Sequence, residues 1–302
     1  MDRRGAFQRT MPTSATIQKR QELTDFIERE LVPELAVQAV IGTGSIASGL
    51  ARPDSDIDAI IFFDPLDLYV VPAESKWNPS DGSFNSIMEA APEECMQFDF
   101  ARFDLTQWAD PSFEWSEERC SELREGWIAF DRFGKVAKLI EMRTTFTDQI
   151  RKVKLDKAIT MLDQHLSKGR PESCWASLGA AIAQDRLQAA YEHLVQALFA
   201  YNRHWRPWRD REMSSLLTLP WLPEGFADCI LGVLNSPSPD YTGHLVRVDN
   251  LRRLFQNLTG RLVDDGEYGI DIVGEAFVRS HQEPGRAWNM GEWNKKHGQR
   301  RV

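Results

Sequence analysis

Two patterns of hydrophobic residues divide the chain. Short, dense apolar runs rich in branched side chains occupy residues 36–41, 57–63 and 96–103, as in buried strands. From about residue 148 the strand pattern ends, and apolar residues recur three and four positions apart, as on one face of a helix. The pattern predicts an α/β fold in which a mixed, twisted sheet precedes a helical domain.

The same periodicity predicts the remaining elements. A helix is expected over residues 13–31, with Thr13 or Ser14 as its cap and Pro33 at its end. The proline-rich stretch 64–94 is expected to be irregular, and we favour a surface loop anchored by Trp77 over a lid for a ligand. Further helices are expected over 108–125, 149–166, 175–203, 226–235 and 246–258, a strand over 127–130, and a helix or strand over 136–142.

The change of pattern also predicts the domain organisation. Residues 1–145 are expected to form the domain that holds the sheet, and residues 146–285 the helical domain. Residues 286–302 are basic and lack a core pattern, so we expect a mobile tail there.

Candidate chemistry gathers between the first two predicted strands. Asp56 and Asp58 flank Ile57, so in a strand they project from the same face. Two carboxylates on one face repel each other unless a cation lies between them, and oxygen ligands suit Mg²⁺. The preceding Gly44 and Ser45 offer close backbone approach and a hydroxyl to phosphate groups.

A third acid follows on the next predicted strand. Asp99 lies between Phe98 and Phe100, where a carboxylate is costly without a metal, a donor or solvent access. Asp104 is five residues further on and therefore faces the opposite side. It also begins an Asp-Leu-Thr-Gln stretch typical of a helix cap, so we favour Asp99 as the third acid.

The order strand, Gly44-Ser45, spacer, Asp56-Ile57-Asp58, strand resembles the nucleotidyltransferase domain of the DNA polymerase beta superfamily. The chain is most similar in kind to bacterial aminoglycoside-type nucleotidyltransferases. The resemblance covers about 37–64 and 96–106, and more loosely 126–141. Because this superfamily carries its third acid on a neighbouring strand, the resemblance also implies a role for Asp99.

The resemblance implies a metal-dependent enzyme with two Mg²⁺ ions. The implied metal ligands are Asp56, Asp58 and Asp99. Asp99 either accepts the proton of the attacking hydroxyl or only binds metal, and the sequence does not decide between these roles. The implied contacts with the nucleotide are Gly44, Ser45 and Arg52.

The implied reaction moves a nucleoside monophosphate, with ATP as the favoured donor, to a hydroxyl of a small cationic acceptor. A protein acceptor, as in antitoxin-like or regulatory adenylyltransferases, is the first alternative. A non-catalytic nucleotide-binding module on the same fold is the second. The sequence does not settle the acceptor, the nucleotide base or the oligomeric state.

Asp185 and Glu192 are candidate contacts for a cationic acceptor. They are seven residues apart and therefore share one face of the helix expected over 175–203, away from its apolar stripe. The competing interpretation places both acids on an outer, solvated face.

Composition narrows the partners further. The net charge of −9 argues against a broad polynucleotide-binding surface, so nucleic acid is not an expected partner. No apolar run reaches the length of about 18 residues that a membrane span needs. The four cysteines are scattered without metal-ligand spacing, which predicts reduced thiols in a cytoplasmic protein.

Overall fold

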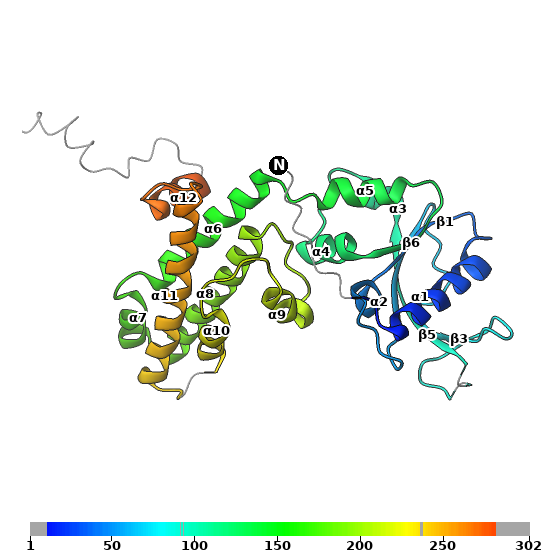
Figure 1. The fold of residues 1–302 in the computed structure, drawn as a ribbon, viewed down its shortest axis with the longest axis horizontal. Helices are drawn as coiled ribbons and strands as arrows, with labels where there is room; N and C mark the ends of the chain where they lie inside the picture. Colours follow the sequence, from blue (N-terminus) through cyan, green and yellow to red (C-terminus); the bar gives the residue numbers. More distant parts are fainter. Residues whose placement is uncertain (1–10, 91, 93, 236–237, 282–302) are drawn as a thin grey trace, which may run out of the picture. The chain divides into compact units, whose positions relative to one another are not determined.

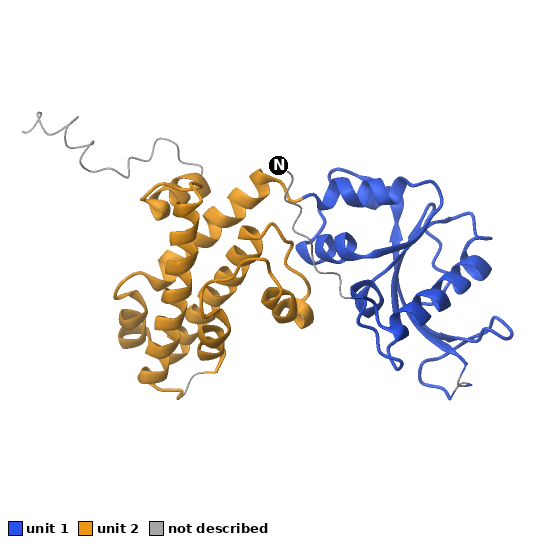
Figure 2. Ribbon diagram, viewed as in Figure 1, with its two compact units in different colours: residues 1–145 blue, residues 146–302 orange. Residues whose placement is uncertain are grey.

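The computed structural model describes residues 11–90, 92, 94–235 and 238–281. The chain forms two compact units, residues 1–145 and 146–302, which meet in sequence between Thr145 and Phe146 (Figure 2). Each unit is described separately. The tail expected over residues 286–302 lies outside the described residues.

Unit 1 contains a six-stranded mixed sheet with the strand order β4-β3-β5-β2-β1-β6 (Figure 1). β2 and β5 are parallel, and the other neighbouring strands are antiparallel. The predicted α/β fold with a mixed sheet and a helical second part is therefore confirmed. The strands are β1 (Val37–Gly42), β2 (Ile57–Phe63), β3 (Glu74–Trp77), β4 (Phe84–Asn85), β5 (Met96–Asp104) and β6 (Trp127–Asp131).

Helices cover both faces of this sheet. On one face, Phe26 of α1 packs in a cluster with Ile57 and Phe98. On the other face, Ile60 and Phe62 pack with residues of α3, α4 and α5. The helices are α1 (Ser14–Phe26), its π-helical continuation η1 (Ile27–Leu31), α2 (Gly44–Ser48), α3 (Leu105–Ala109), α4 (Glu117–Glu125) and α5 (Lys135–Thr144).

The stretch predicted as irregular, residues 64–94, contributes two strands to the sheet. β3 pairs with β5, and β4 pairs with β3. The sequences of β3 and β4 are too short and polar to show apolar alternation. These segments are strands because they pair with a neighbouring strand. Trp77 is 2% exposed and packs edge-on against Phe26, so it anchors this stretch, but it does so from strand β3 and not from a surface loop as expected.

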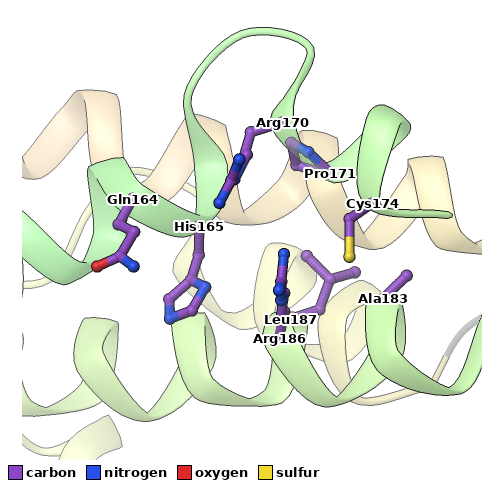
Figure 3. Close-up of a pocket in the computed structure, with 8 residues that line it drawn as sticks. All are labelled: Gln164, His165, Arg170, Pro171, Cys174, Ala183, Arg186 and Leu187. Carbon is purple, nitrogen blue, oxygen red and sulfur yellow. The ribbon is translucent and has the colours of Figure 1, made fainter. Parts of the chain in front are cut away.

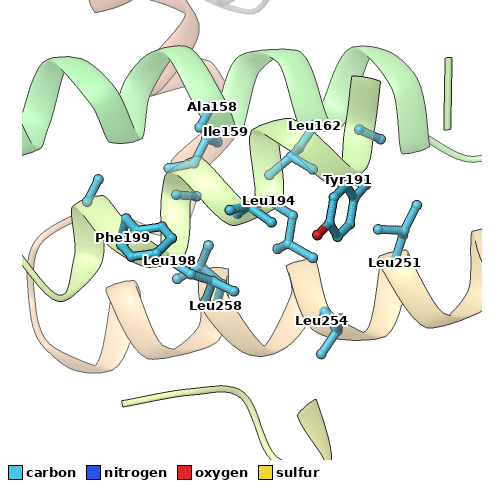
Figure 4. Close-up of a cluster of buried hydrophobic side chains, with 14 of the residues drawn as sticks. Ala158, Ile159, Leu162, Tyr191, Leu194, Leu198, Phe199, Leu251, Leu254 and Leu258 are labelled. Carbon is cyan, nitrogen blue, oxygen red and sulfur yellow. The ribbon is translucent and has the colours of Figure 1, made fainter. Parts of the chain in front are cut away.

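Unit 2 is helical, and α8 runs through its core (Figure 4). The predicted apolar stripe of this helix is confirmed, since Leu187, Tyr191, Leu194 and Leu198 are buried. They pack against side chains of α6 and α11. The helices are α6 (Asp148–Leu166), α7 (Arg170–Leu178), α8 (Ala180–Tyr201), α9 (Arg209–Leu217), α10 (Phe226–Leu234), α11 (Tyr241–Asp264) and α12 (Ile272–Ser280).

Two expectations for the helices were wrong. The single helix expected over 175–203 is broken at Gly179, whose φ of 89° is open to glycine and strained for other residues. The helix expected over 108–125 is also interrupted, because α3 ends at Ala109 and α4 begins at Glu117. Within the described residues, the helices are too short or too polar to cross a membrane.

Candidate active site

The pairing of β2 with β5 brings two of the predicted acids together. Asp58 is the direct partner of Asp99 in the parallel ladder, between the pairs Ile57 with Phe98 and Ala59 with Phe100. Paired residues on neighbouring strands project from the same face of a sheet. That face is opposite α1, because Phe98 packs on the α1 side and the side chains alternate.

The turn after β1 lies directly beside this pair. Gly42, the last residue of β1, pairs with Ala59, and the amide of Thr43 donates to the carbonyl of Asp58 at 2.9 Å. The chain then enters α2 through Gly44, which has a φ of 61°. The Gly44-Ser45 turn and Asp58 are thus joined by a backbone hydrogen bond.

Packing around this turn leaves little room for a side chain at position 42. A Cβ atom there would lie 2.8 Å from Cδ1 of Ile46 and 3.0 Å from Cε3 of Trp127. Both side chains would have to move to make room for it. The absence of a side chain at Gly42 therefore lets α2 lie against β6.

Arg20 of α1 fixes the other end of α2. Its Nε donates to the carbonyl of Ile46 at 2.8 Å, and its Nη2 donates to the carbonyl of Ala47 at 3.1 Å. Its guanidinium also lies 5.1 Å from the ring centre of Trp127. Carbonyls at the end of a helix lack partners within it, and Arg20 supplies them. Sequence reasoning missed this residue, because a helical arginine carries no local sign of such contacts.

The first turn of α1 holds the segment that follows α2. The hydroxyl of Thr13 donates to the carbonyl of Ala51 at 2.9 Å, and the amide of Ala51 donates to the hydroxyl of Thr16 at 3.0 Å. Thr13 is also the N-cap of α1, as predicted, since its hydroxyl accepts from the amide of Thr16. The start of α1 and Arg20 together anchor the chain between β1 and the acids.

A fourth acid lies beside Asp99. Glu74 of β3 is the pairing partner of Asp99 on the side away from Asp58. Asp99 is exposed, yet the partial burial of its carboxyl raises its pKa, and the charges of Glu74 and Asp56 raise it further. Glu74 was missed from the sequence because β3 was predicted to be irregular. Glu74 and Asp56 therefore lie close enough to Asp99 for their charges to act on it.

Asp104 has the structural role that its sequence predicted. It pairs with Phe63 at the end of β5 and is the N-cap of α3. Its Oδ1 accepts from the amide of Thr106 at 2.9 Å.

The acids have the donor chemistry that Mg²⁺ prefers, because all of them offer carboxylate oxygens. Burial is the main cause of the raised pKa of Asp99, and the smaller contribution, repulsion by Glu74 and Asp56, would be relieved by a cation. Within the described residues, no three acidic, histidine or cysteine side chains are arranged to hold a metal ion as they stand. The donor set thus fits Mg²⁺ in its chemistry, while its side chains do not converge on one point.

Arg52, the third predicted nucleotide contact, lies at the surface. Its side chain is 77% exposed, and its Nε lies 3.4 Å from Oδ1 of Asp54. The hydroxyl of Ser55 accepts from the amide of Arg52 at 3.0 Å, which closes the turn that leads to Asp56. A contact between Arg52 and a nucleotide stays a prediction.

The two predicted acceptor contacts lie on α8 in unit 2. Asp185 is exposed, as either interpretation of this helix face expects. Glu192 forms ion pairs with Arg206 and with Arg209, which lies 3.3 Å away. Both arginines also pair with Glu212, whose side chain is 3% exposed. The charge of Glu192 is therefore already compensated within unit 2, and an acceptor contact there stays a prediction.

Comparison with known proteins bears on the same segment. Residues 24–99 match the family model of the nucleotidyltransferase domain. The matched residues run from α1 to β5 and include Gly44, Ser45 and the three predicted acids. A search of curated proteins found no match.

Among solved structures, the chain is similar to the crystal structure of a nucleotidyltransferase-like protein from Exiguobacterium sibiricum. The two sequences are 13% identical, and the TM-score is 0.41. The alignment covers 92% of this chain and 84% of that protein.

Proposed function

We propose that this protein is a metal-dependent nucleotidyltransferase. It would move a nucleoside monophosphate, AMP from ATP in the favoured case, to a hydroxyl of a small cationic acceptor. The observation that carries the proposal is the direct pairing of Asp58 with Asp99 beside the Gly44-Ser45 turn. This arrangement lies inside the residues that match the nucleotidyltransferase domain.

In the proposed reaction the acceptor oxygen forms a bond to the α-phosphorus. The bond from that phosphorus to the oxygen bridging the α and β phosphates breaks, and pyrophosphate leaves. The hydroxyl proton passes to a base. Asp99 is the candidate base, since a raised pKa makes a carboxylate a better proton acceptor. The competing role for Asp99 is that of a metal ligand alone.

Asp56, Asp58 and Asp99 are the residues proposed to hold Mg²⁺, with two ions expected. When bound, Mg²⁺ would neutralise charge on the phosphates and on the oxygens that exchange at phosphorus. The chain itself positions the acids: β2 and β5 hold Asp58 and Asp99 in register. The charges of Glu74 and Asp56 act on Asp99 as well, and a metal site would explain why acids gather here, whereas a non-catalytic module would not.

The phosphates of the nucleotide are proposed to bind at the turn after β1. The amide of Gly44 and the hydroxyl of Ser45 would hold the β and γ phosphates, and Arg52 would reach the triphosphate from the neighbouring turn. The anchoring of this segment by Arg20 and the Thr13 hydroxyl supports a preformed site.

The acceptor is the least constrained part of the proposal. The net charge of −9 and the exposed Asp185 support a cationic small molecule. Glu192 contributes less than its sequence position indicated, because arginines already pair with it. A protein acceptor and a non-catalytic nucleotide-binding module are the alternatives that the test must separate.

The test combines Mg²⁺, ATP or GTP labelled at the α-phosphate, and a panel of cationic, neutral and protein acceptors. Pyrophosphate release with label on a small molecule supports the proposal. Label on protein favours the protein-modifying alternative, and nucleotide binding without pyrophosphate release favours the binding module.

Matched variants assign the chemistry to the paired acids. We expect Asp58→Asn to abolish transfer. Asp104→Asn is the control, because it changes an acid at the end of β5 while asparagine caps a helix about as well as aspartate does. Full activity in Asp58→Asn would overturn the proposed metal site.

A further inference from the structure

Unit 2 contains a cavity of about 90 Å³ between the end of α6, the start of α7 and α8 (Figure 3). Its wall includes His165, Arg170 and Arg186, with Leu187 on the apolar side. A second cavity of about 130 Å³ shares Arg170 and Arg186 with the first. One water needs only about 10–15 Å³ of such space, so each cavity is large enough for a small ligand.

The first cavity is lined by two arginines and a histidine, together with the neutral side chains of Gln164 and Cys174. Figure 3 shows the guanidinium groups of Arg170 and Arg186 directed into the same space from α7 and α8, with the imidazole of His165 beside them. No carboxylate lines either cavity. Arg170 is exposed and Arg186 is half-buried, so the cavity is open to solvent, and an anion that enters it meets two positive charges.

These arginines differ from others in the same unit. Arg206, Arg252 and Arg279 each form an ion pair with a carboxylate. Within the described part of the chain, neither Arg170 nor Arg186 has an acidic partner. Arg247 and Arg253 also lack an acidic partner in the described part of the chain, but their guanidinium groups donate to Gln184 and to Asn250. Among the described residues, the guanidinium groups of Arg170 and Arg186 have no hydrogen-bond acceptor of this kind and line a cavity.

The nearest acids do not neutralise the cavity. Glu172, in the first turn of α7, pairs with Arg252 at 2.8 Å. Asp185 is exposed and does not line the cavity, although its charge opposes the effect of the arginines on His165. Burial lowers the pKa of His165, and Arg186 and Arg170 lower it further. The net field at His165 is therefore positive.

We propose that this cavity binds a phosphate-type oxyanion, either inorganic phosphate or the phosphate group of a small phosphomonoester. Guanidinium groups match phosphate oxygens through paired, charge-assisted hydrogen bonds. Ser173 of the second cavity adds a hydroxyl group beside the same arginines, whereas the hydroxyl of Ser177 already donates to the carbonyl of Ser173 at 2.7 Å. All of these residues belong to unit 2, whereas the paired acids belong to unit 1, so the inference does not rest on the proposed transferase activity.

The direct test is calorimetric titration of the full chain without Mg²⁺, at constant ionic strength. Inorganic phosphate and glycerol 3-phosphate are the two probes, and chloride is the control anion. We expect saturable binding of at least one probe, and tighter binding of glycerol 3-phosphate would identify a phosphomonoester as the preferred source.

Three variants locate the site. Arg186→Gln and Arg170→Gln should each weaken binding by about tenfold or more, because each removes a charged hydrogen-bond donor. Arg211→Gln is the matched control, since Arg211 is an exposed arginine of the same unit that pairs with Asp210. Absence of saturable binding to the wild-type chain, or an equal loss in all three variants, would overturn the proposal.

The imidazole of His165 provides an independent readout by NMR. The charged groups that face it are Arg170, Arg186 and Asp185, and the ring of His193 stacks at 6.2 Å. Bound phosphate should raise the pKa of His165, because a negative charge beside the ring favours its protonated form. His281 of the same unit serves as the internal reference, and equal shifts at both histidines would contradict a site at the cavity.

Discussion

Removal of Arg20 tests how the turn between β1 and the acids is held. In Arg20→Ala, the carbonyls of Ile46 and Ala47 lose a charged donor, and Trp127 loses its cation contact. Hydrogen bonds to charged groups contribute about 1.5–3 kcal/mol each, and an exposed cation contact about 0.5–1 kcal/mol. Because water can replace part of the interaction at this half-buried site, we expect a local loss of about 3 kcal/mol.

The assay is hydrogen exchange followed by mass spectrometry, read on residues 44–50. A loss of about 3 kcal/mol corresponds to roughly a hundredfold rise in local opening. Nucleotide affinity should fall by less, up to about tenfold, because binding weakens only as far as the ordered turn is depopulated. The exchange rate of Arg20→Lys should lie between those of the wild-type chain and Arg20→Ala. A lysine ammonium keeps the charge but lacks the forked guanidinium that reaches both carbonyls.

Gln21→Ala is the control for this series. Gln21 is the next residue of α1, is exposed, and bonds to Asp25 of its own helix. It should leave exchange at residues 44–50 unchanged. If Arg20→Ala also leaves that exchange unchanged, Arg20 does not hold the turn, and the reasoning from its hydrogen bonds is wrong.

The other predictions concern the acids of the two units. Asp99→Ala should remove transfer activity, whereas Asp104→Ala should retain it and lower the unfolding free energy by about 1 kcal/mol, because a helix cap is lost; denaturant titration and the transfer assay separate the two. Glu74→Gln should lower the pKa of Asp99 in the metal-free protein without restoring its usual value, because burial is the larger cause, as a carboxyl NMR titration would show. Since the folded-state pKa of Asp99 is raised, its ionised form destabilises the metal-free protein at neutral pH. Asp99→Asn should therefore raise the thermal midpoint at pH 7. The gain should disappear as the pH falls towards the ordinary aspartate pKa, because Asp99 is then protonated in the wild-type chain as well. Asp156→Ala should lower the unfolding free energy of unit 2 by about 3 kcal/mol, because this buried carboxylate accepts two hydrogen bonds from Arg279. Urea titration measures this loss, and a much smaller loss would contradict the prediction.

Local chain geometry was enough to predict several features of unit 1. The dense apolar runs identified β1, β2 and β5, because burial on both sides requires such sequences. The alternation of a strand placed Asp99 and Asp104 on opposite faces, and the cap pattern identified the start of α3. Such features depend on neighbours within a few positions along the chain.

Contacts between distant segments decided the rest. The parallel pairing that places Asp58 beside Asp99 depends on strands separated by more than thirty residues, and the sequence implied it only through the family resemblance. The place of Glu74 in the sheet depends on pairing with β5, because its own strand lacks an apolar alternation.

The sequence by itself determined the strands of the core and the apolar stripe of α8, because each follows from the periodicity of a single element. The shared face of Asp56 and Asp58 stays a prediction, because β2 begins at Ile57. The tertiary structure alone decided that Arg20 holds the turn after β1 and that arginines compensate Glu192. The physical reason is that charged side chains on helix surfaces have many partners within reach, and packing selects among them. A sequence pattern records which face a residue occupies, and the folded chain determines what that face meets.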